Sequence, residues 1–349
     1  MKILIAPLNW GLGHASRCVP LVQHLLNEGH EVILGGDGES LTLLRKHFPK
    51  LRYTYLAPLN LRYSAGSRQV WAMIKAMPQL LKWAIQDHLM LKTLLREEHI
   101  DQIISDNRFG LYLKQGQTTS NDVKQPQTIY LTHQLHIMLP RGWKWAEPIA
   151  SRIHACIYAR YNKVWVPDYP DPQRSLAGEL SHPKISNFKF QISNLLYIGP
   201  LSRFSTNPLT TNPIIRYDIV AVLSGLEPHR TLLEQEIIAR YSNSPKDGQT
   251  SNSASAQTLI VQGLMHRPNT RIKRGNITFV PYMSDAELAS ALLGAKHIIA
   301  RSGYSTIMDL EALGLLTANS QQLTAKIELI PTPGQPEQEY LATLHNKMQ

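Results

Sequence analysis

The sequence has few of the features that assign a chain to a class at once. Only two cysteines, Cys18 and Cys156, occur among its 349 residues, too few for a disulfide scaffold or a cysteine-built zinc site. No run of about 18 apolar residues occurs, which predicts that no helix spans a membrane. The apolar run at residues 1–7 is too short for a signal peptide. These absences predict a cytoplasmic protein, with the inner face of the membrane as the alternative location.

Acidic side chains are scarce relative to basic ones. The chain has 36 Lys and Arg against 26 Asp and Glu, a net charge of +10, which attracts nucleotide phosphates, nucleic acid or anionic lipid. Phenylalanine is also rare, with six residues, and no RNP-like or zinc-finger pattern occurs. These absences argue against a dedicated nucleic-acid module, so no nucleic-acid partner is expected.

Short apolar runs alternate with helical stretches along the whole chain. Apolar residues make up 43% of the sequence and charged residues 18%, which is enough for large buried cores. Strands separated by helices are typical of βαβ units, which build parallel sheets. The predicted strands cover residues 2–6, 30–35, 100–106, 128–132, 163–167 and 195–199, and then 218–223, 258–262, 277–280, 297–300 and 327–330.

The composition changes between these two sets of strands. Residues 203–213, RFSTNPLTTNP, are rich in Pro, Thr and Asn, which is typical of a linker. We therefore predict two doubly wound α/β domains, at residues 1–200 and 217–349, joined by a linker at 201–216. Segments without a core pattern, predicted to be mobile surface loops, are 116–127 and 242–257.

A glycine-bearing loop follows the first predicted strand. Gly11-Leu12-Gly13-His14 opens a predicted helix, whose first N–H groups and positive dipole end suit an anion. As a GxGxxG motif, with Ser16 at the third glycine and Asp37 as the ribose-binding acid, it predicts a nicotinamide or flavin site. A plain strand-to-helix turn is an alternative. His14 favours another interpretation, because a histidine at the carboxyl edge of a sheet can act as a general base.

A second strand, turn and helix lie in the last third of the chain. The turn at Arg301-Ser302-Gly303 precedes a helix with Ser305 and Thr306 in its first turn, another anion-binding helix start. Asp309 follows one turn later and can accept hydrogen bonds from the two hydroxyls of a ribose. A Pro-Gly loop then leads to Glu337 and Gln338, whose side chains can hold sugar hydroxyls. A capped helix followed by a solvent-exposed loop is the alternative.

Together these motifs resemble glycosyltransferase family 28, which includes the lipid-linked N-acetylglucosaminyltransferase of peptidoglycan synthesis and the diacylglycerol glycosyltransferases. Segment 301–309, followed by the Pro-Gly loop and Gln338, is similar to the nucleotide-sugar site of that family. Other loops of the family are matched, in chain order, by Gly11-Leu12-Gly13-His14, Thr132-His133-Gln134 and Ser224-Gly225-Leu226-Glu227-Pro228.

The resemblance implies the GT-B fold, in which two Rossmann-like, doubly wound parallel-sheet domains face each other across a cleft. It also implies inverting transfer of a hexose, most commonly N-acetylglucosamine, from a UDP-sugar to an acceptor hydroxyl, with no cofactor and no metal ion. The donor-binding residues that it implies are Ser224, Gly225, Arg301, Ser302, Gly303, Ser305, Thr306, Asp309, Glu337 and Gln338.

Two residues compete for the role of catalytic base. His14 can take the proton of the acceptor hydroxyl, or it can contact the donor phosphate and leave that role to Asp106. A buried capping role is the alternative for Asp106, and a packed loop position is the alternative for His133. The residues predicted on the acceptor side are Gly11, Gly13, His133 and Gln134.

The chain departs from the family pattern near its end. Asp309 stands where the family usually has Glu, and Leu341 stands where it often has Asn. Segment 315–326 is longer than usual, and the last helix is expected to be short or missing. A non-catalytic nucleotide-sugar-binding protein of the same fold is therefore an alternative to the transferase, as is the oxidoreductase.

Basic and aromatic residues are interleaved in two segments, 62–96 and 139–145. Trp combined with Lys and Arg suits a lipid headgroup interface. This composition, together with the family resemblance, favours a lipid-linked acceptor and peripheral contact with an anionic membrane, with a small-molecule acceptor as the alternative. Helices packed on the core with solvated lysines are the alternative. The first segment holds Arg62, Arg68, Lys75, Lys82, Lys92 and Arg96 against one acid, Asp87, together with Trp71, Ile74, Met77, Leu81 and Trp83.

Overall fold

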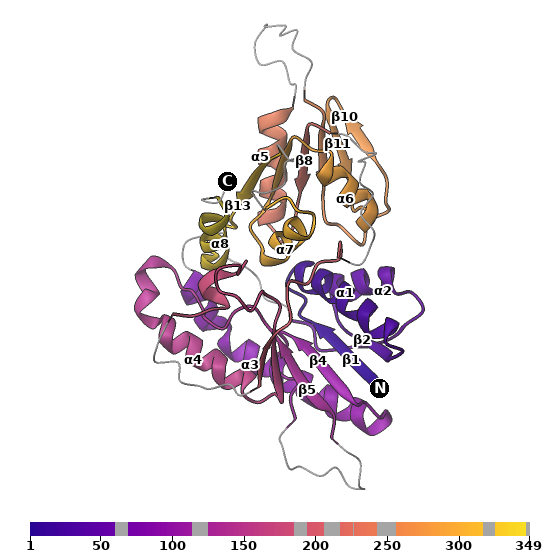
Figure 1. The fold of residues 1–349 in the computed structure, drawn as a ribbon, viewed down its shortest axis with the longest axis vertical. Coiled ribbons are helices and arrows are strands. Elements are labelled where there is room, and N and C mark those ends of the chain that lie inside the picture. The colour runs from indigo at the N-terminus through magenta and orange to yellow at the C-terminus, as the bar shows by residue number, and fades with distance from the viewer. Residues whose placement is uncertain are drawn as a thin grey trace, which may run out of the picture. The chain divides into compact units, whose positions relative to one another are not determined.

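Two compact units make up the protein. The computed structural model describes residues 1–59, 69–113, 125–184, 194–205, 217–225, 227–242, 256–316 and 325–346. The first unit contains Met1–Ser202 together with Gly334–Glu337, and the second contains Arg203–Pro333 and Gln338–Gln349. Each unit is built on its own sheet (Figure 1).

Over the described residues, the sheet of the first unit has seven strands in the order β3-β2-β1-β4-β5-β6-β7. Neighbouring strands all pair in parallel. Because helices cover both faces, the central strands carry buried apolar runs, and Ile3, Leu4 and Ile5 of β1 are fully buried. The strands are β1 (Lys2–Pro7), β2 (Glu31–Gly36), β3 (Arg52–Tyr55), β4 (Gln102–Asp106), β5 (Gln127–Leu131), β6 (Lys163–Val166) and β7 (Leu195–Tyr197).

The helices of the first unit lie on both faces of its sheet. Helices α1 (Gly13–Asn27) and α2 (Gly38–His47) connect strands in one direction along the sheet, and α3 (Gln69–Glu97) and α4 (Glu147–Tyr158) connect them in the other. Since parallel crossovers are right-handed, the two pairs lie on opposite faces (Figure 1). The Phe109 ring packs between Trp83 of α3 and His154 of α4, with centroids 5.7 and 6.4 Å away. Helices α3 and α4 are therefore neighbours.

The second unit has a six-stranded sheet over its described residues, in the order β10-β11-β9-β8-β12-β13. All pairs are parallel except the edge pair β10–β11. The strands are β8 (Ile219–Val222), β9 (Thr258–Val261), β10 (Ile272–Arg274), β11 (Ile277–Val280), β12 (His297–Arg301) and β13 (Lys326–Ile330). Its helices are α5 (His229–Tyr241), α6 (Asp285–Leu293) and α7 (Tyr304–Ala312), together with α8 (Pro336–Asn346) from Gln338 onward. Short 3-10 helices lie in the first unit at η1 (Arg141–Ala146) and η2 (Gly178–Leu180).

The strand order reverses direction once in each sheet, between β1 and β4 and between β8 and β12. Loops that leave the carboxyl ends of the strands diverge at such a switch point, and ligands of open α/β sheets bind there. Both glycine-bearing loops singled out from the sequence leave their sheets at these points.

The predicted doubly wound α/β architecture is confirmed, and each predicted strand is present with small shifts at its ends. Strands β3 and β10 were not predicted, because both are edge strands without a buried apolar run. The side chains of β3 are mostly exposed, and those of β10 are all exposed. Exposed edge strands of this kind lack the apolar periodicity that marks a buried strand in a sequence.

The units divide between Ser202 and Arg203, at the start of the predicted linker, although residues 206–216 lie outside the described ranges. The prediction assigned all of 217–349 to the second domain, whereas Gly334–Glu337 belong to the first unit. Much of the segments 116–127, 242–257 and 315–326 also falls outside the described residues. Among all the residues that the structure describes, no helix combines the length and apolarity needed to cross a bilayer.

Candidate active site

Three strand ends meet at the switch point of the first sheet. His14 lies in the first turn of α1, which follows β1, Asp106 is the last residue of β4, and His133 follows β5. Pro7 pairs in register with Asp106, and Asp106 pairs with Leu131, so the ends of β1, β4 and β5 are adjacent. The parallel order thus brings together residues that are far apart in the sequence.

A buried ion pair joins Arg17 of α1 to Asp106. Asp106 is fully buried, and Arg17 is 2% exposed. The guanidinium binds both carboxylate oxygens, with Nε donating to Oδ2 over 2.7 Å and Nη2 donating to Oδ1. Burial disfavours the charged carboxylate, but Arg17 and His14 outweigh it and hold the pKa of Asp106 well below its usual range. Asp106 is therefore ionised and a weak base.

His14 has one ring nitrogen bound and one available. Nδ1 lies 2.9 Å from Oδ1 of Asp106 and 3.0 Å from Nη2 of Arg17. No described residue forms a hydrogen bond with Nε2, and the side chain is 16% exposed. Donation from Nδ1–H to the carboxylate leaves the Nε2 lone pair free to accept a proton.

His133 and Gln134 both bind Glu337, which belongs to the first unit. Nη1 of Arg17 lies 3.1 Å from Nδ1 of His133, and because a guanidinium only donates, the His133 proton resides on Nε2. That Nε2 donates to Oε1 of Glu337 over 2.8 Å, and Gln134 Nε2 donates to Oε2. Burial lowers the pKa of His133, consistent with a neutral ring. Glu337, predicted on the donor side, thus contacts residues predicted on the acceptor side.

The structure disfavours a dinucleotide site at the loop before α1, because the predicted ribose-binding acid, Asp37, is already bound by other side chains. Gly11 has a φ of 77°, a conformation that favours glycine, and Gly13 begins the helix. Asp37 is engaged by protein groups, since its Oδ1 accepts from Arg108 Nη1 at 2.8 Å and its Oδ2 accepts from Asn9 Nδ2 at 3.0 Å. A ribose at Asp37 would have to displace both partners.

The second unit carries predicted donor residues at its own switch point. Ser224 and Gly225 follow β8, and the turn into α7 follows β12. Helix α7 has Gly303 at its N-cap, with no side-chain cap and no acidic residue in the first turn, where Ser305 and Thr306 lie. A Cβ at Gly225 or Gly303 would meet no atom within 4 Å. An open helix start of this kind can bind a phosphate.

Arg301, Ser302 and Gln338 join loops of the second unit to one another. Arg301 is buried, and its Nη1 and Nη2 donate to the carbonyls of Pro331 and His229 over 2.9 and 2.8 Å. Ser302 Oγ donates to the Gln338 carbonyl over 2.8 Å. Gln338 Oε1 accepts from a backbone N–H of the Pro-Gly loop at 2.8 Å. These bonds tie the end of β12 to the loop after β13 and to the starts of α5 and α8.

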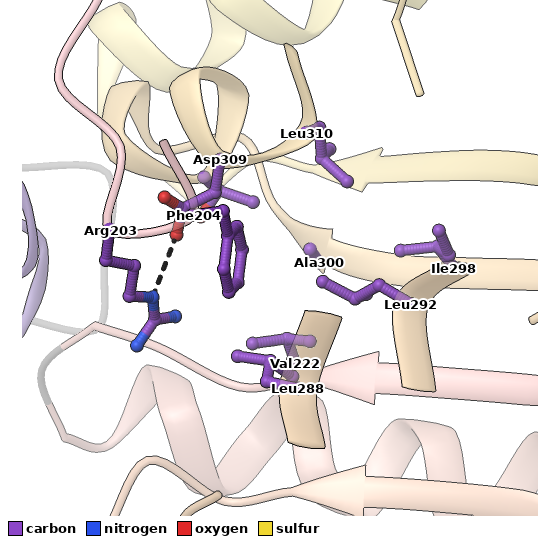
Figure 2. Close-up of a pocket in the computed structure, with 10 residues that line it drawn as sticks. Arg203, Phe204, Val222, Leu288, Leu292, Ile298, Ala300, Asp309 and Leu310 are labelled. Carbon is purple, nitrogen blue, oxygen red and sulfur yellow. Dashed lines mark hydrogen bonds and ion pairs between the residues drawn. The ribbon is translucent and has the colours of Figure 1, made fainter. Parts of the chain in front are cut away.

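Asp309 borders a small cavity in the second unit. The cavity encloses about 30 Å³ among β8, β12, α6 and α7, enough for one or two water molecules. Arg203 Nε donates to Asp309 Oδ2 over 3.3 Å beside the apolar lining (Figure 2). Nη1 of Arg203 also lies 3.5 Å from Oδ1 of Asp285. Because the cavity is too small for a ribose, a nucleotide at Asp309 has to compete with Arg203.

Within the parts of the chain that the structure describes, no group of three or more His, Cys, Asp or Glu side chains is placed to hold a metal ion. Arg17 and Arg203 were not identified from the sequence as site residues. The signal for Arg17 was available, because it lies three residues after His14 on the same side of a helix. Arg203 gave no such signal, since its partners Asp285 and Asp309 are distant in sequence.

The named relatives of this chain are glycosyltransferases. An uncharacterized glycosyltransferase of Methanosarcina acetivorans is 26% identical over 323 residues, which cover 90% of this chain and 78% of the relative. One from Methanosarcina mazei is 22% identical over 327 residues, with the same coverage. No protein-family model matches the sequence.

Solved glycosyltransferase structures share the architecture. The spinosyn rhamnosyltransferase SpnG matches with a TM-score of 0.52 and 15% identity, over 90% of this chain and 79% of SpnG. Its complex with thymidine diphosphate matches with a TM-score of 0.52 and 13% identity, over 100% of this chain and 90% of SpnG. This chain has the GT-B fold. The fold that the resemblance implied is therefore confirmed, while the narrower assignment to family 28 stays a prediction.

The depressed pKa of Asp106 predicts a pH-dependent contribution to stability. Because the folded pKa lies below the unfolded value of about 3.9, this carboxylate stabilises the fold above about pH 4, and the contribution is lost as pH falls through the folded pKa. Asp106→Asn should lower the free energy of unfolding by about 3–5 kcal/mol at neutral pH, because the buried charge of Arg17 is no longer balanced by a carboxylate.

Urea unfolding measured at several pH values tests this prediction. The difference between wild type and Asp106→Asn should narrow as the pH falls below about 4. Asp171→Asn, at an exposed carboxylate, is the matched control and should change stability by less than about 1 kcal/mol. A difference for Asp106→Asn that stays constant with pH would contradict the assignment.

Proposed function

We propose that this protein is an inverting, metal-independent glycosyltransferase. It transfers a hexose, with N-acetylglucosamine as the first candidate, from a UDP-sugar to a hydroxyl of a lipid-linked acceptor. One observation carries the proposal. At the switch point of a GT-B sheet, the buried carboxylate of Asp106 binds Nδ1 of His14 and leaves Nε2 available. The names of the Methanosarcina relatives support the reaction class.

His14 is the base in this proposal. Its Nε2 takes the proton of the acceptor hydroxyl as that oxygen attacks the anomeric carbon, and the bond from this carbon to the diphosphate oxygen breaks. A single displacement inverts the configuration. Asp106 orients the ring through Nδ1 and stabilises the imidazolium that forms. Asp106 itself is a poor candidate for the base, because it is fully buried and both its oxygens are bound.

The departing diphosphate is stabilised by groups of the second unit. The N-terminus of α7 and the backbone at Ser224 and Gly225 supply N–H donors, and the helix dipole adds positive potential without a metal ion. The hydroxyls of Ser305 and Thr306 add further donors. Asp309 accepts the ribose hydroxyls in exchange for its ion pair with Arg203.

The acceptor assignment is supported by two exposed apolar stripes on the neighbouring helices α3 and α4. On α3, four residues at a spacing of four project from the side opposite to buried Leu80, Trp83 and Leu91. A second series runs from η1 along α4 at the same spacing. The two series, here called the apolar stripes, are Met77, Leu81, Ile85 and Leu89, and Trp145, Ile149 and Ile153.

Exposed cations lie among the apolar stripes, namely Lys75, Lys82, Lys92, Lys144 and Arg152. An apolar surface flanked by Lys and Arg binds the interface of an anionic bilayer, where a lipid-linked acceptor resides. Trp83 and Asp87 do not contribute to this surface, contrary to the composition argument. Trp83 is buried and donates to the Ala57 carbonyl over 2.8 Å, and buried Asp87 pairs with Arg108.

His14→Ala should lower turnover by about 10²–10⁴-fold, the usual contribution of a general base. Affinity for the donor nucleotide should change little, because the groups proposed to bind its diphosphate and ribose lie in the second unit. His24→Ala, at an exposed histidine of the same helix, is the matched control. Transfer to a lipid extract from a radiolabelled UDP-sugar and calorimetric binding of UDP give the two readouts. Full turnover in His14→Ala would remove His14 as the base, and donor binding without any transfer by wild type would favour a non-catalytic protein.

Asp309→Ala should weaken UDP binding by about 1.5–3 kcal/mol, the range for a hydrogen bond to a charged group. Glu311→Ala, on the same helix, should have a much smaller effect. Calorimetry with UDP and with thymidine diphosphate, the nucleotide bound in the SpnG complex, compares the two bases. An unchanged affinity in Asp309→Ala would place the ribose elsewhere, and exclusive binding of the thymidine nucleotide would replace UDP as the donor.

The double variants Leu81→Glu/Ile85→Glu and Ile149→Glu/Ile153→Glu should each weaken vesicle binding by about tenfold or more, because each loses apolar contact and gains charge repulsion. Sedimentation with phosphatidylglycerol-containing vesicles measures the effect. Leu232→Glu, at an exposed leucine of the second unit, is the control. Equal binding of all variants, or no binding by wild type, would reject the membrane surface.

A further inference from the structure

Arg17 contacts three titratable groups through one guanidinium. It binds both oxygens of Asp106, its Nη2 lies 3.0 Å from Nδ1 of His14, and its Nη1 lies 3.1 Å from Nδ1 of His133. The residue is 2% exposed, so it is not open to a substrate phosphate. Arg17 therefore has to act through the side chains that it contacts.

The state of His14 depends on which partner Nδ1 uses. If Nδ1 accepts a hydrogen bond from Arg17, the proton resides on Nε2 and the ring cannot act as a base. If Nδ1–H donates to Asp106, Nε2 keeps its lone pair. A carboxylate has about four acceptor positions, and Arg17 uses two of those on Asp106. Asp106 can therefore also accept from Nδ1, over the observed 2.9 Å.

Charge decides how readily the ring takes a second proton. A carboxylate within hydrogen-bond distance stabilises an imidazolium, and a nearby guanidinium destabilises it. The charged and titratable groups facing His14 are Asp106 at the end of β4, Arg17 on α1, His133 after β5 and Glu337 on α8. Arg17 therefore offsets the attraction that the Asp106 carboxylate exerts on a proton at His14.

We propose that Arg17 is a positioning residue that binds Asp106 through two N–H groups and balances its negative charge. Asp106 then orients His14 through Nδ1 without drawing a proton onto Nε2, and His133 is fixed with its proton on Nε2. This inference rests on the proposed function because it takes His14 as the base. Its test is independent of turnover, since the protonation of a histidine ring is measured without substrate.

Long-range ¹⁵N–¹H correlation spectra of the full chain labelled at histidine report the tautomer and the titration midpoint of each ring. Signals of His14 and His133 are assigned from the variants His14→Gln and His133→Gln. In wild type at about pH 7, His14 should carry its proton on Nδ1 and His133 should carry its proton on Nε2. Arg17→Gln should raise the His14 midpoint by at least about one pH unit, a tenfold tighter binding of the proton.

Three further variants separate this role from a structural one. Arg17→Lys keeps the charge and should return the His14 midpoint towards wild type. Asp106→Asn should lower the midpoint, because only the cation remains. The pair Arg17→Gln/Asp106→Asn removes both charges, leaves no unpaired ion to disturb folding, and should bring the midpoint close to wild type. Arg160→Gln, at an exposed arginine of the first unit, controls for net charge.

The order of midpoints decides the proposal. We expect the His14 midpoint of Asp106→Asn to be below that of wild type, the midpoint of the double variant to be close to it, and the midpoint of Arg17→Gln to be above it. If Arg17→Gln does not fold, the Asp106→Asn and double variants still test the order. Equal midpoints throughout, or wild-type His14 with its proton on Nε2, would overturn the role of Arg17. The predicted order together with full turnover in His14→Ala would instead overturn the proposed function.

Discussion

The buried pair of Arg17 and Asp106 is the interaction on which the edge of the first sheet depends. A carboxylate at the end of a central strand, with no solvent exposure, is tolerated only when an opposite charge and hydrogen bonds compensate it. Arg17 supplies both and also contacts two histidine rings. A second buried arginine, Arg108, binds Asp37 and Asp87 in the same unit. Its side-chain nitrogens bind carboxylates and backbone carbonyls, with no histidine ring among these partners, which is typical of a structural role.

Both units place polar side chains by the same constraint. Parallel strands end at one edge of a sheet, and the reversal of strand order separates the loops there. In the first unit this edge holds His14 and the buried Arg17–Asp106 ion pair. In the second unit it holds an uncapped helix start and two glycines with open space around them. In the proposed reaction, the first of these edges supplies the proton acceptor and the second supplies the surface that binds the donor diphosphate.

The sequence predicted those parts of the structure that depend on burial. Strands such as β1 and β12 are apolar because both faces are covered, so their positions and the doubly wound architecture followed from the pattern. Strands β3 and β10 lie at exposed edges and carry no such signal. The meeting of His14 with Asp106 could be expected from two strand ends at one edge. The engagement of Asp37 by Arg108 and Asn9, the pairing of Asp309 with Arg203, and the contact of His133 with Glu337 could not, because each depends on side chains brought close only by tertiary structure.

The assignment of Gly334–Glu337 to the first unit means that this unit is not a continuous stretch of chain. During synthesis, its described strands, β1 to β7, emerge long before these four residues, and the described strands of the second unit, β8 to β13, are made in between. Domains generally fold as units as they leave the ribosome. Here the first unit has to wait for Gly334–Glu337 before His133 and Gln134 obtain their carboxylate partner. A chain that has not yet reached Glu337 therefore carries the Arg17–Asp106 pair without this partner of His133 and Gln134.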